Sequence, residues 1–317
     1  MPRPLEEAVV VVTGASSGIG RAAALRLARR GASLALCARS PGPLAAVAAA
    51  CEAAGAAVLH ESVDVAEEEA VERFAAAAEQ RFGRIDVWVN AAAVMAYGDF
   101  TEIPSEVFRR VVEVNLMGQV HGARAALRRF EDQGSGVLIN VSSVWGRVTS
   151  PKVSPYVVSK HAVRAFSECI ESELHGRGIH VATIVPEAVD TPIFEHAGNY
   201  TGRQVRPIPP MLDPEQVARG IEACAESPKH DVAYGQAGKL LEVLYAVAPA
   251  LYRRFAHAAF VRGTLGDHPA DPAPGNVLEP TDPHSVEGAW RARRPRTLRR
   301  ALLGALAGGA RGMLRKG

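Results

Sequence analysis

The feature that most constrains the fold is a regular alternation of short apolar runs and longer segments with helical spacing over residues 1–186. The first run, VVVVT at 9–13, is β-branched and apolar throughout, as a strand buried on both faces of a parallel sheet must be. Strands that alternate with helices of this length form βαβ units with right-handed crossovers. The sequence therefore predicts an α/β fold: a doubly wound parallel β-sheet of about seven strands, flanked by helices on both faces, with a C-terminal extension.

The alternation sets the expected elements and domain limits. Predicted strands lie at 9–13, 33–38, 56–63, 85–91, 136–143 and 180–186. Predicted helices lie at 18–30, 41–54, 67–82 and 104–131, followed by a helix that holds Tyr156 and runs to about residue 176, and by 239–262, broken at Pro249. Because no boundary interrupts this pattern, residues 1–265 are expected to form one domain that includes a substrate lid, and 266–317 an extension.

The extension has two parts of different composition. Residues 266–284 hold five prolines and almost no apolar periodicity, which predicts an extended linker or a wrapping arm. The last segment predicts a basic amphipathic helix, weakened by glycines. Its apolar positions at helical spacing are Leu298, Leu302, Leu306, Ala310 and Met313. Such a helix favours contact with an anionic membrane surface, or packing on the body or on a neighbouring subunit.

Charge and composition exclude several classes of protein. Residues 288–317 hold nine basic and no acidic residues, so a chain of net charge +2 leaves −7 for residues 1–287, which argues against nucleic-acid binding by the body. No apolar stretch could span a membrane, and the N-terminus lacks a secretory signal, so a cytoplasmic protein is expected, with the tail as a candidate peripheral membrane contact. The four cysteines are expected to be buried and reduced, and no metal site is expected.

A glycine-containing turn joins the first predicted strand to the first helix. In TGASSGIG (13–20), glycines let the backbone turn sharply and approach a pyrophosphate, and the helix N-terminus offers unpaired N–H groups. This loop lies at the carboxyl end of a strand, where open α/β sheets bind ligands. We predict a dinucleotide site here; the alternative is a glycine-rich turn without a ligand.

The ordered motifs resemble those of the short-chain dehydrogenase/reductase family over about residues 8–240. The spacing of Gly14, Gly18 and Gly20 is followed by NAAA, NLMG, NVSS, YVVSK and VPEAVDTP. The resemblance implies a Rossmann-type fold, a nicotinamide cofactor, an oxidoreductase acting on CH–OH and C=O groups, and a homo-dimer or homo-tetramer. The cofactor residues that it implies are Gly14, Ser16, Ser17, Gly18, Ile19, Gly20, Arg39, Asp64, Val65, Asn90, Tyr156, Lys160, Pro186, Val189 and Thr191.

The end of the second strand indicates which nicotinamide is bound. An acidic side chain there would accept from the ribose 2′-hydroxyl and repel a 2′-phosphate, but this chain has Ala38 followed by Arg39. Since a guanidinium can bind phosphate through a charge-assisted fork, we predict NADP (NADPH) in preference to NAD. The alternative is an arginine that faces solvent.

Tyr156 and Lys160 are four residues apart, so they share a helix face. The resemblance implies that Tyr156 is the general acid and base and that Lys160 binds the nicotinamide ribose and lowers the pKa of the tyrosine, as does an oxidised nicotinamide. It also implies that Ser143 holds the substrate oxygen and that Asn115 anchors a water that relays protons. A sensor or scaffold that binds NADP without turnover is the alternative function.

Two of the motifs depart from the family pattern, and the substrate segments are apolar. Ala91 and Ala93 replace an asparagine and a glycine, and Glu187 stands where a glycine is usual. Glu187 could contact a polar substrate group, but we expect it to point into solvent. The segments after the predicted strands suggest a small hydrophobic carbonyl or alcohol as substrate, through Met95, Val144, Trp145, Phe194, His196 and Tyr200.

Overall fold

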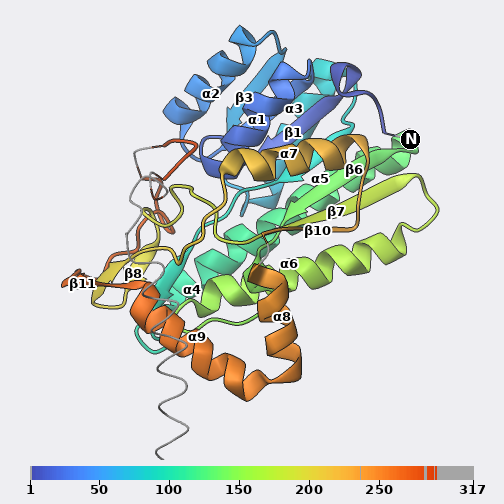
Figure 1. The fold of residues 1–317 in the computed structure, drawn as a ribbon. Coiled ribbons are helices and arrows are strands. Elements are labelled where there is room, and N and C mark those ends of the chain that lie inside the picture. Colours follow the sequence, from blue (N-terminus) through green and yellow to red (C-terminus); the bar gives the residue numbers. More distant parts are fainter. Residues whose placement is uncertain (1, 236, 282–283, 289, 291–317) are drawn as a thin grey trace, which may run out of the picture.

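A seven-stranded, fully parallel sheet forms the centre of the molecule (Figure 1). The computed structural model describes residues 2–235, 237–281, 284–288 and 290. The strand order is β10-β7-β6-β4-β1-β2-β3. The strands are β1 (Val9–Thr13), β2 (Ser33–Ala38), β3 (Val58–Ser62), β4 (Val87–Asn90), β6 (Gly136–Val141), β7 (Ile179–Pro186) and β10 (Asp231–Tyr234). The order reverses between β1 and β4, so the crevice for a ligand opens at the carboxyl ends of these strands.

Helices cover both faces of the sheet, as the alternation predicted. One face carries α1 (Gly18–Arg29), α2 (Pro41–Ala53) and α7 (Pro214–Glu226), and the other α3 (Glu68–Phe82), α4 (Ser105–Val112), α5 (Gly118–Gln133) and α6 (Ser154–Glu173). Successive residues of β1 alternate between the two layers: Val10 and Val12 pack under the first, Val11 under the second. A strand buried on both faces has no polar side, which explains the run VVVV.

The helix predicted over 104–131 is interrupted. Between α4 and α5 the chain forms five residues of π-helix, Glu113–Met117, with Asn115 in the middle. Such insertions occur frequently at functional sites. Two single turns of 3-10 helix, Leu5–Glu7 and Val144–Gly146, lie before β1 and after β6.

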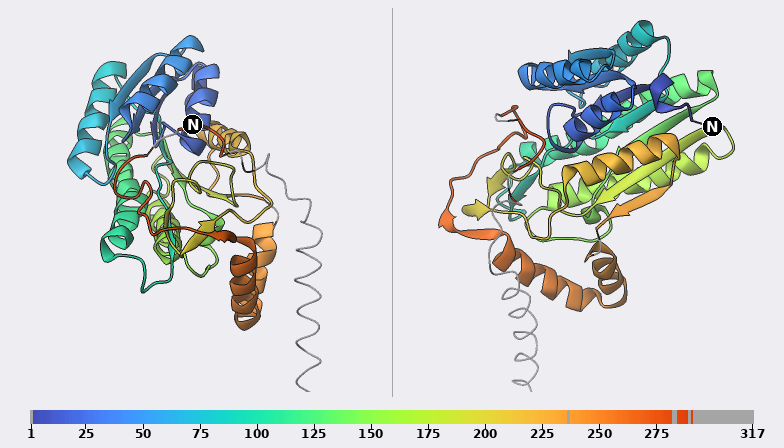
Figure 2. Two further views of the ribbon diagram at one scale, coloured as in Figure 1. Left: turned by 90° about the vertical axis from the view of Figure 1, so that its left-hand side faces the viewer. Right: turned by 45° about the horizontal axis from the view of Figure 1, so that its top comes forward.

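The chain after β7, together with the segment after β4, builds the region around the crevice. Two small sheets pair β5 (Ala96–Gly98) with β8 (Gly198–Tyr200), and β9 (Arg203–Val205) with β11 (Leu265–Pro269). Helices α8 (Ala237–Val247) and α9 (Pro249–Gly263) form a hairpin that projects from the body, and the break predicted at Pro249 is confirmed (Figure 2).

Residues 270–281 and 284–288, called the arm below, follow β11 and lie against the body. Of the two alternatives for the proline-rich segment, the structure thus shows a wrapping arm. Val277 is fully buried in the same layer as α3 and α5. The predicted basic helix lies in 291–317, outside the described residues.

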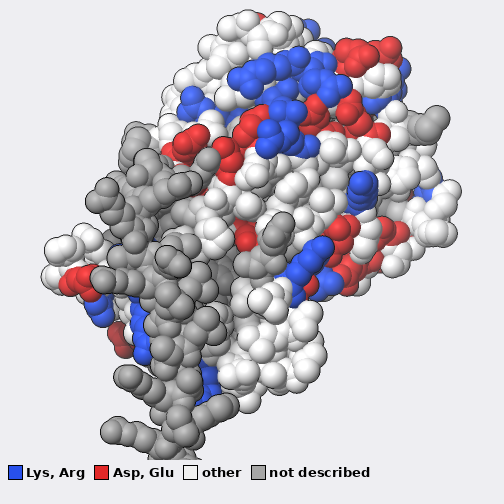
Figure 3. Space-filling model, in the orientation of Figure 1, with Lys and Arg blue, Asp and Glu red and all other residues white. Residues whose placement is uncertain are grey.

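Many charged side chains gather over α1 and α7 on the face shown in Figure 3. Ion pairs join α1 to α7, among them Arg30 with Glu226 at 2.7 Å. The α8–α9 hairpin instead exposes apolar side chains, including Leu240, Val247 and Leu251. No helix among the described residues has the length and apolarity needed to cross a bilayer.

Candidate active site

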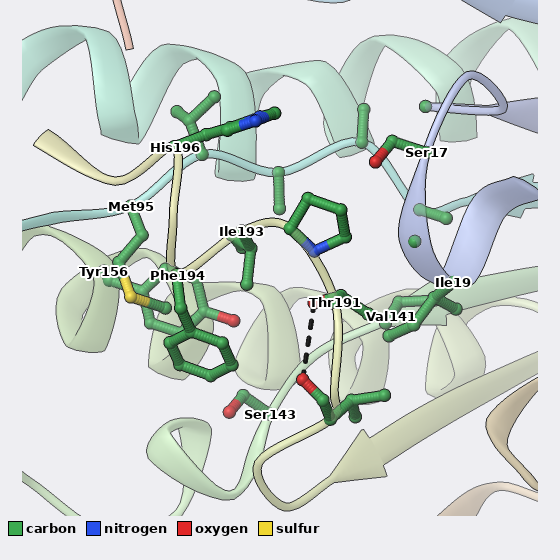
Figure 4. A pocket seen from close by; sticks show the side chains of 18 of the residues that line it. Ser17, Ile19, Met95, Val141, Ser143, Tyr156, Thr191, Ile193, Phe194 and His196 are labelled. Atoms are coloured by element: carbon green, nitrogen blue, oxygen red, sulfur yellow. Dashed lines mark hydrogen bonds between the residues drawn. The ribbon is translucent and has the colours of Figure 1, made fainter. Parts of the chain in front are cut away.

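A cavity of about 340 Å³ lies at the carboxyl ends of the central strands (Figure 4). Most of the predicted site residues line it: Gly14, Ser16, Ser17, Gly18, Ile19, Arg39, Asp64, Val65, Ser143, Tyr156, Lys160, Pro186, Val189 and Thr191. Gly20, Asn90 and Asn115 do not. One continuous cavity therefore joins the predicted phosphate loop to the predicted proton-transfer residues.

The loop between β1 and α1 needs its glycines because neighbouring backbone is close. Gly14 has φ +67°, and a Cβ there would lie 2.7 Å from the Cα of Ala92. A Cβ on Gly20 would lie 2.4 Å from the carbonyl oxygen of Gly14. Gly20 thus allows α1 to pack against the loop, and Gly14 allows the loop to pass close to the chain that follows β4.

At the other end, side chains from β6 and α6 meet. Ser143 follows β6, and Tyr156 and Lys160 lie in the first two turns of α6. Lys160 donates from Nζ to the carbonyl oxygen of Val141 at 2.8 Å, and the same Nζ lies 5.5 Å from the centroid of the Tyr156 ring. Figure 4 shows Ser143 and Tyr156 beside the same part of the cavity, with Ser17 and Ile19 at the opposite end. Helical spacing thus places the pair as predicted.

The electrostatics of the pair differ from the expectation. Burial raises the pKa of Tyr156 to about 12, and the neighbouring Ser143 hydroxyl opposes this only in part. Burial also lowers the pKa of Lys160, which is 2% exposed, to about 7. The protein's own groups therefore do not produce the predicted lowering of the tyrosine pKa. They hold Tyr156 protonated at neutral pH, beside an amine that titrates there.

Asn115 and Asn90 support the site from within the protein. Asn115 is fully buried, and its amide donates to Val94 O at 2.9 Å and to Ser159 Oγ at 3.1 Å, while its Oδ1 accepts from Val94 N at 2.8 Å. The side chain thereby fastens a cavity-wall residue to α6. Asn90 bonds Trp88 and Asn140 inside the sheet, so its side chain lies behind the cavity wall on which we predicted a cofactor contact.

Arg39 lies at the predicted adenosine end of the cavity, directly after β2. Its Nη2 donates to the carbonyl oxygen of Asn276 at 2.6 Å and its Nη1 to that of Val277 at 3.3 Å. Burial lowers the pKa of the guanidinium. The alternative of an arginine that simply faces solvent is therefore wrong. Nearby, the Asp64 carboxylate accepts from Ala66 N at 3.0 Å and forms an ion pair with Arg110.

Glu187 does not point into solvent, so that expectation is wrong. One carboxylate oxygen accepts from the backbone N–H of Gly238, in the first turn of α8. An acidic group at a helix N-terminus satisfies an unpaired N–H and complements the helix dipole. Where a glycine is usual in the family, this chain thus has a side chain that ties the α8–α9 hairpin to the cavity rim.

The substrate end of the cavity is apolar. Met95, Val144, Trp145, Phe194 and His196 line it as predicted, whereas Tyr200 packs beside the core under α4. Its wall also includes residues that no sequence signal identified. These are Ile193, Ile208 and Leu241 at the substrate end, and Asn276, Pro280, Thr281 and His284 from the arm.

Among the described residues, no group of histidine, cysteine and acidic side chains could hold a metal ion. All four cysteines are free; Cys37, Cys51 and Cys224 are buried as predicted, but Cys169 is exposed.

Comparisons with known proteins agree with this geometry. The family model for short chain dehydrogenases matches residues 8–200. An uncharacterized oxidoreductase of Bacillus subtilis, YxnA, is 34% identical over 280 residues, which cover 87% of this chain and 79% of that protein. A short chain dehydrogenase/reductase from Burkholderia phymatum, solved in complex with NAD, superposes with a TM-score of 0.71 at 27% identity, over 86% of this chain and 99% of that one.

An alcohol dehydrogenase of the archaeon Thermococcus sibiricus, complexed with 5-hydroxy-NADP, is 30% identical with a TM-score of 0.62, over 72% of this chain and 95% of that one. Sequence, fold and cavity thus lead to one conclusion: the chain belongs to the short-chain dehydrogenase/reductase family of oxidoreductases.

Proposed function

We propose that the protein is an NADP-dependent oxidoreductase that transfers a hydride between the nicotinamide and a carbonyl or secondary alcohol of a hydrophobic substrate, with Tyr156 as general acid and base. The observation that carries the proposal is the cluster of Ser143, Tyr156 and Lys160 on the cavity wall, where Lys160 Nζ lies 5.5 Å from the centroid of the Tyr156 ring. It lies in the same cavity as the glycine loop and Arg39.

The residues fit a nicotinamide dinucleotide. The glycine loop, which lines the cavity at the N-terminus of α1, suits the pyrophosphate, and Arg39 suits the adenosine end. When bound, the cofactor supplies or accepts the hydride. Ser143 then holds the substrate oxygen by a hydrogen bond, and Tyr156 delivers a proton to that oxygen during reduction. Lys160 supplies a proton to replace the one that Tyr156 has given up, because its amine titrates near neutral pH.

The preference for NADP rests on Arg39. Proteins solved with NAD and with an NADP derivative both share this fold, so the fold alone does not discriminate. A guanidinium that lines the cavity directly after β2 offers a fixed positive charge to a 2′-phosphate, which NAD lacks.

The substrate class rests on the apolar wall formed by Met95, Trp145, Phe194, Ile193 and Ile208. A pocket of this kind stabilises apolar groups of the substrate by burial. The hydroxyls of Ser143 and Tyr156 then orient the reacting oxygen.

A screen of apolar ketones, aldehydes and secondary alcohols, followed by NADPH or NADP absorbance, tests the proposal. We expect turnover with at least one apolar carbonyl or alcohol, and tighter binding of NADPH than of NADH by cofactor fluorescence. Tight NADPH binding without any turnover would support the sensor instead; binding of neither cofactor would refute the proposal altogether.

We also propose peripheral contact with an anionic membrane through the α8–α9 hairpin and the basic tail. Support comes from the exposure of Leu240 (72%) and Val247 (81%) beside the exposed Arg253 and Arg254. Full-length protein should sediment with anionic vesicles at low salt. Val247→Asp should release it, whereas Phe100→Asp, at an exposed apolar site elsewhere, should not. If instead Val247→Asp dissociates a dimer or tetramer in solution without affecting sedimentation, the hairpin is a subunit interface.

A further inference from the structure

The arm starts far from the adenosine end of the cavity but finishes on it. After β11 the chain runs towards the side of the molecule where α1 and α2 lie (Figure 1). Ala273 and Asn199 exchange backbone hydrogen bonds of 3.0 and 2.8 Å, and Asn276 N donates to His196 O at 2.8 Å. Together with the buried side chain of Val277, these contacts fix the middle of the arm on the body.

A turn at Gly275 directs the arm over the cavity. The residue has φ +56°, and a Cβ there would lie 2.2 Å from the carbonyl oxygen of His196. No side chain fits this position, both because the conformation is left-handed and because backbone occupies the space. The path of the arm therefore depends on a glycine that belongs to none of the family motifs.

Beyond the turn, the arm contacts two parts of the predicted cofactor surface. The carbonyl oxygens of Asn276 and Val277 accept hydrogen bonds from the Arg39 guanidinium. These two bonds use two of its five N–H donors. Farther along, the carbonyl oxygen of Ser285 accepts from Gly18 N at 2.8 Å and from Ser17 Oγ at 3.1 Å. The arm thus orients the arginine and ends on the N-terminus of α1.

Two polar atoms of the arm lack a partner. Asn276 Oδ1 and Thr281 Oγ1 are buried and make no hydrogen bond with the described part of the chain, and both residues line the cavity. Buried polar atoms in proteins are almost always hydrogen-bonded. Two unpartnered polar atoms on the wall of one cavity, one of them on the residue whose carbonyl group binds the Arg39 guanidinium, point to a polar ligand in that cavity.

We propose that the arm is part of the cofactor site: Asn276 and Thr281 hydrogen-bond the adenosine ribose and its phosphate, and the backbone of residues 276–277 holds Arg39 in the orientation that selects NADP. The inference rests on the proposed function, since it assumes that the cavity binds a nicotinamide dinucleotide. It adds binding residues more than 230 positions after Arg39, outside the matched region 8–200.

Paired glycine variants of the full-length protein test the path of the arm. Gly275→Ala forces a Cβ against backbone, whereas Gly202→Ala creates the same positive-φ strain (φ +72°) with no atom within 4 Å. We expect Gly275→Ala to raise the Kd of NADPH about tenfold or more, to speed NADPH dissociation, and to expose the arm to limited proteolysis. Gly202→Ala should leave all three unchanged. Equal behaviour of the two variants would overturn the proposal.

Side-chain variants test the two contacts without moving the arm. Thr281→Val removes the hydroxyl at constant shape and should weaken NADPH binding roughly fivefold, the factor of one neutral hydrogen bond, while Thr281→Ser should bind like the wild type. Asn276→Leu should weaken binding by a similar factor. If both variants bind NADPH as the wild type does, the arm does not contact the cofactor. If the wild type binds neither NADPH nor NADH, the proposed function itself has failed.

Discussion

The two ends of the cavity are built in different ways. At the proposed nicotinamide end, Ser143, Tyr156 and Lys160 come from one strand end and the helix that follows it, within 18 residues of sequence. At the proposed adenosine end, Arg39 donates to carbonyl groups of Asn276 and Val277, more than 230 residues later. The residues of the first end are close together in the sequence and belong to a family motif. The second end depends on packing between Arg39 and the arm, which is distant in sequence and lies outside the motifs.

This difference separates two kinds of property. Chemistry at the nicotinamide end requires particular hydroxyl and amine groups, so its residues can be recognised by spacing. Affinity at the adenosine end depends on which surfaces are brought together, and different chains can achieve this with different segments. Substitutions at the first end should therefore change turnover, and those at the second should change cofactor affinity and selectivity.

The largest effect is expected at Tyr156. Tyr156→Phe removes the proton donor and should lower kcat roughly 10²- to 10⁴-fold on any substrate that the screen identifies, with the Kd of NADPH nearly unchanged. Tyr245→Phe, on the α8–α9 hairpin, is the matched control and should keep full turnover. Unaltered turnover in Tyr156→Phe would contradict the proposal that substitutions at the nicotinamide end change turnover while those at the adenosine end change cofactor affinity.

At the other end, Arg39→Ala should act on selectivity. Loss of a charge-assisted contact should lower the preference for NADPH over NADH roughly 10- to 100-fold in Kd, measured by cofactor fluorescence. Arg29→Ala removes an exposed arginine of α1 and should change neither affinity. An equal loss of NADPH and NADH binding would show that Arg39 only holds the arm in place.

Lys160 provides a test by pH. Its pKa is lowered from 10.5 to about 7 in the folded protein, so between these values the unfolded chain binds more protons and the free energy of unfolding should rise with pH. Below pH 7 the full cost of burying the ammonium applies. Lys160→Met should therefore be more stable than the wild type near neutral pH.

That advantage should shrink by up to about 1.4 kcal/mol per pH unit towards pH 10. Urea unfolding at several pH values measures this. Lys229→Met, at an exposed position, should show a constant difference. A constant difference for Lys160→Met as well would mean that the amine keeps its ordinary pKa.

The smallest effect is expected at Glu187, which joins the cavity rim to α8. Glu187→Ala leaves Gly238 N without its acceptor and should lower the free energy of unfolding by about 1 kcal/mol. Glu187→Gln keeps an oxygen acceptor and should lose less. Thermal unfolding of the three proteins measures the order; a Gln variant as unstable as the Ala variant would indicate that charge, rather than the hydrogen bond, holds the helix.

Much of this protein could be read from the sequence, because the relevant signals are short-range. A strand buried on both faces must be apolar throughout, so VVVVT located β1 and the alternation located the sheet. Tyr156 and Lys160 share a helix face because of the helical repeat. Each of these depends on residues a few positions apart.

Tertiary structure alone decided the rest. The pKa values of Tyr156 and Lys160 follow from burial, which depends on every element packed around α6 and reversed the direction expected for the tyrosine. The carboxylate of Glu187 accepts a hydrogen bond from a helix N-terminus about 50 residues away, and the backbone of the arm accepts one from Arg39. Such contacts are set by the path of the chain in space, and proline-rich segments carry no periodic pattern that could reveal their partner.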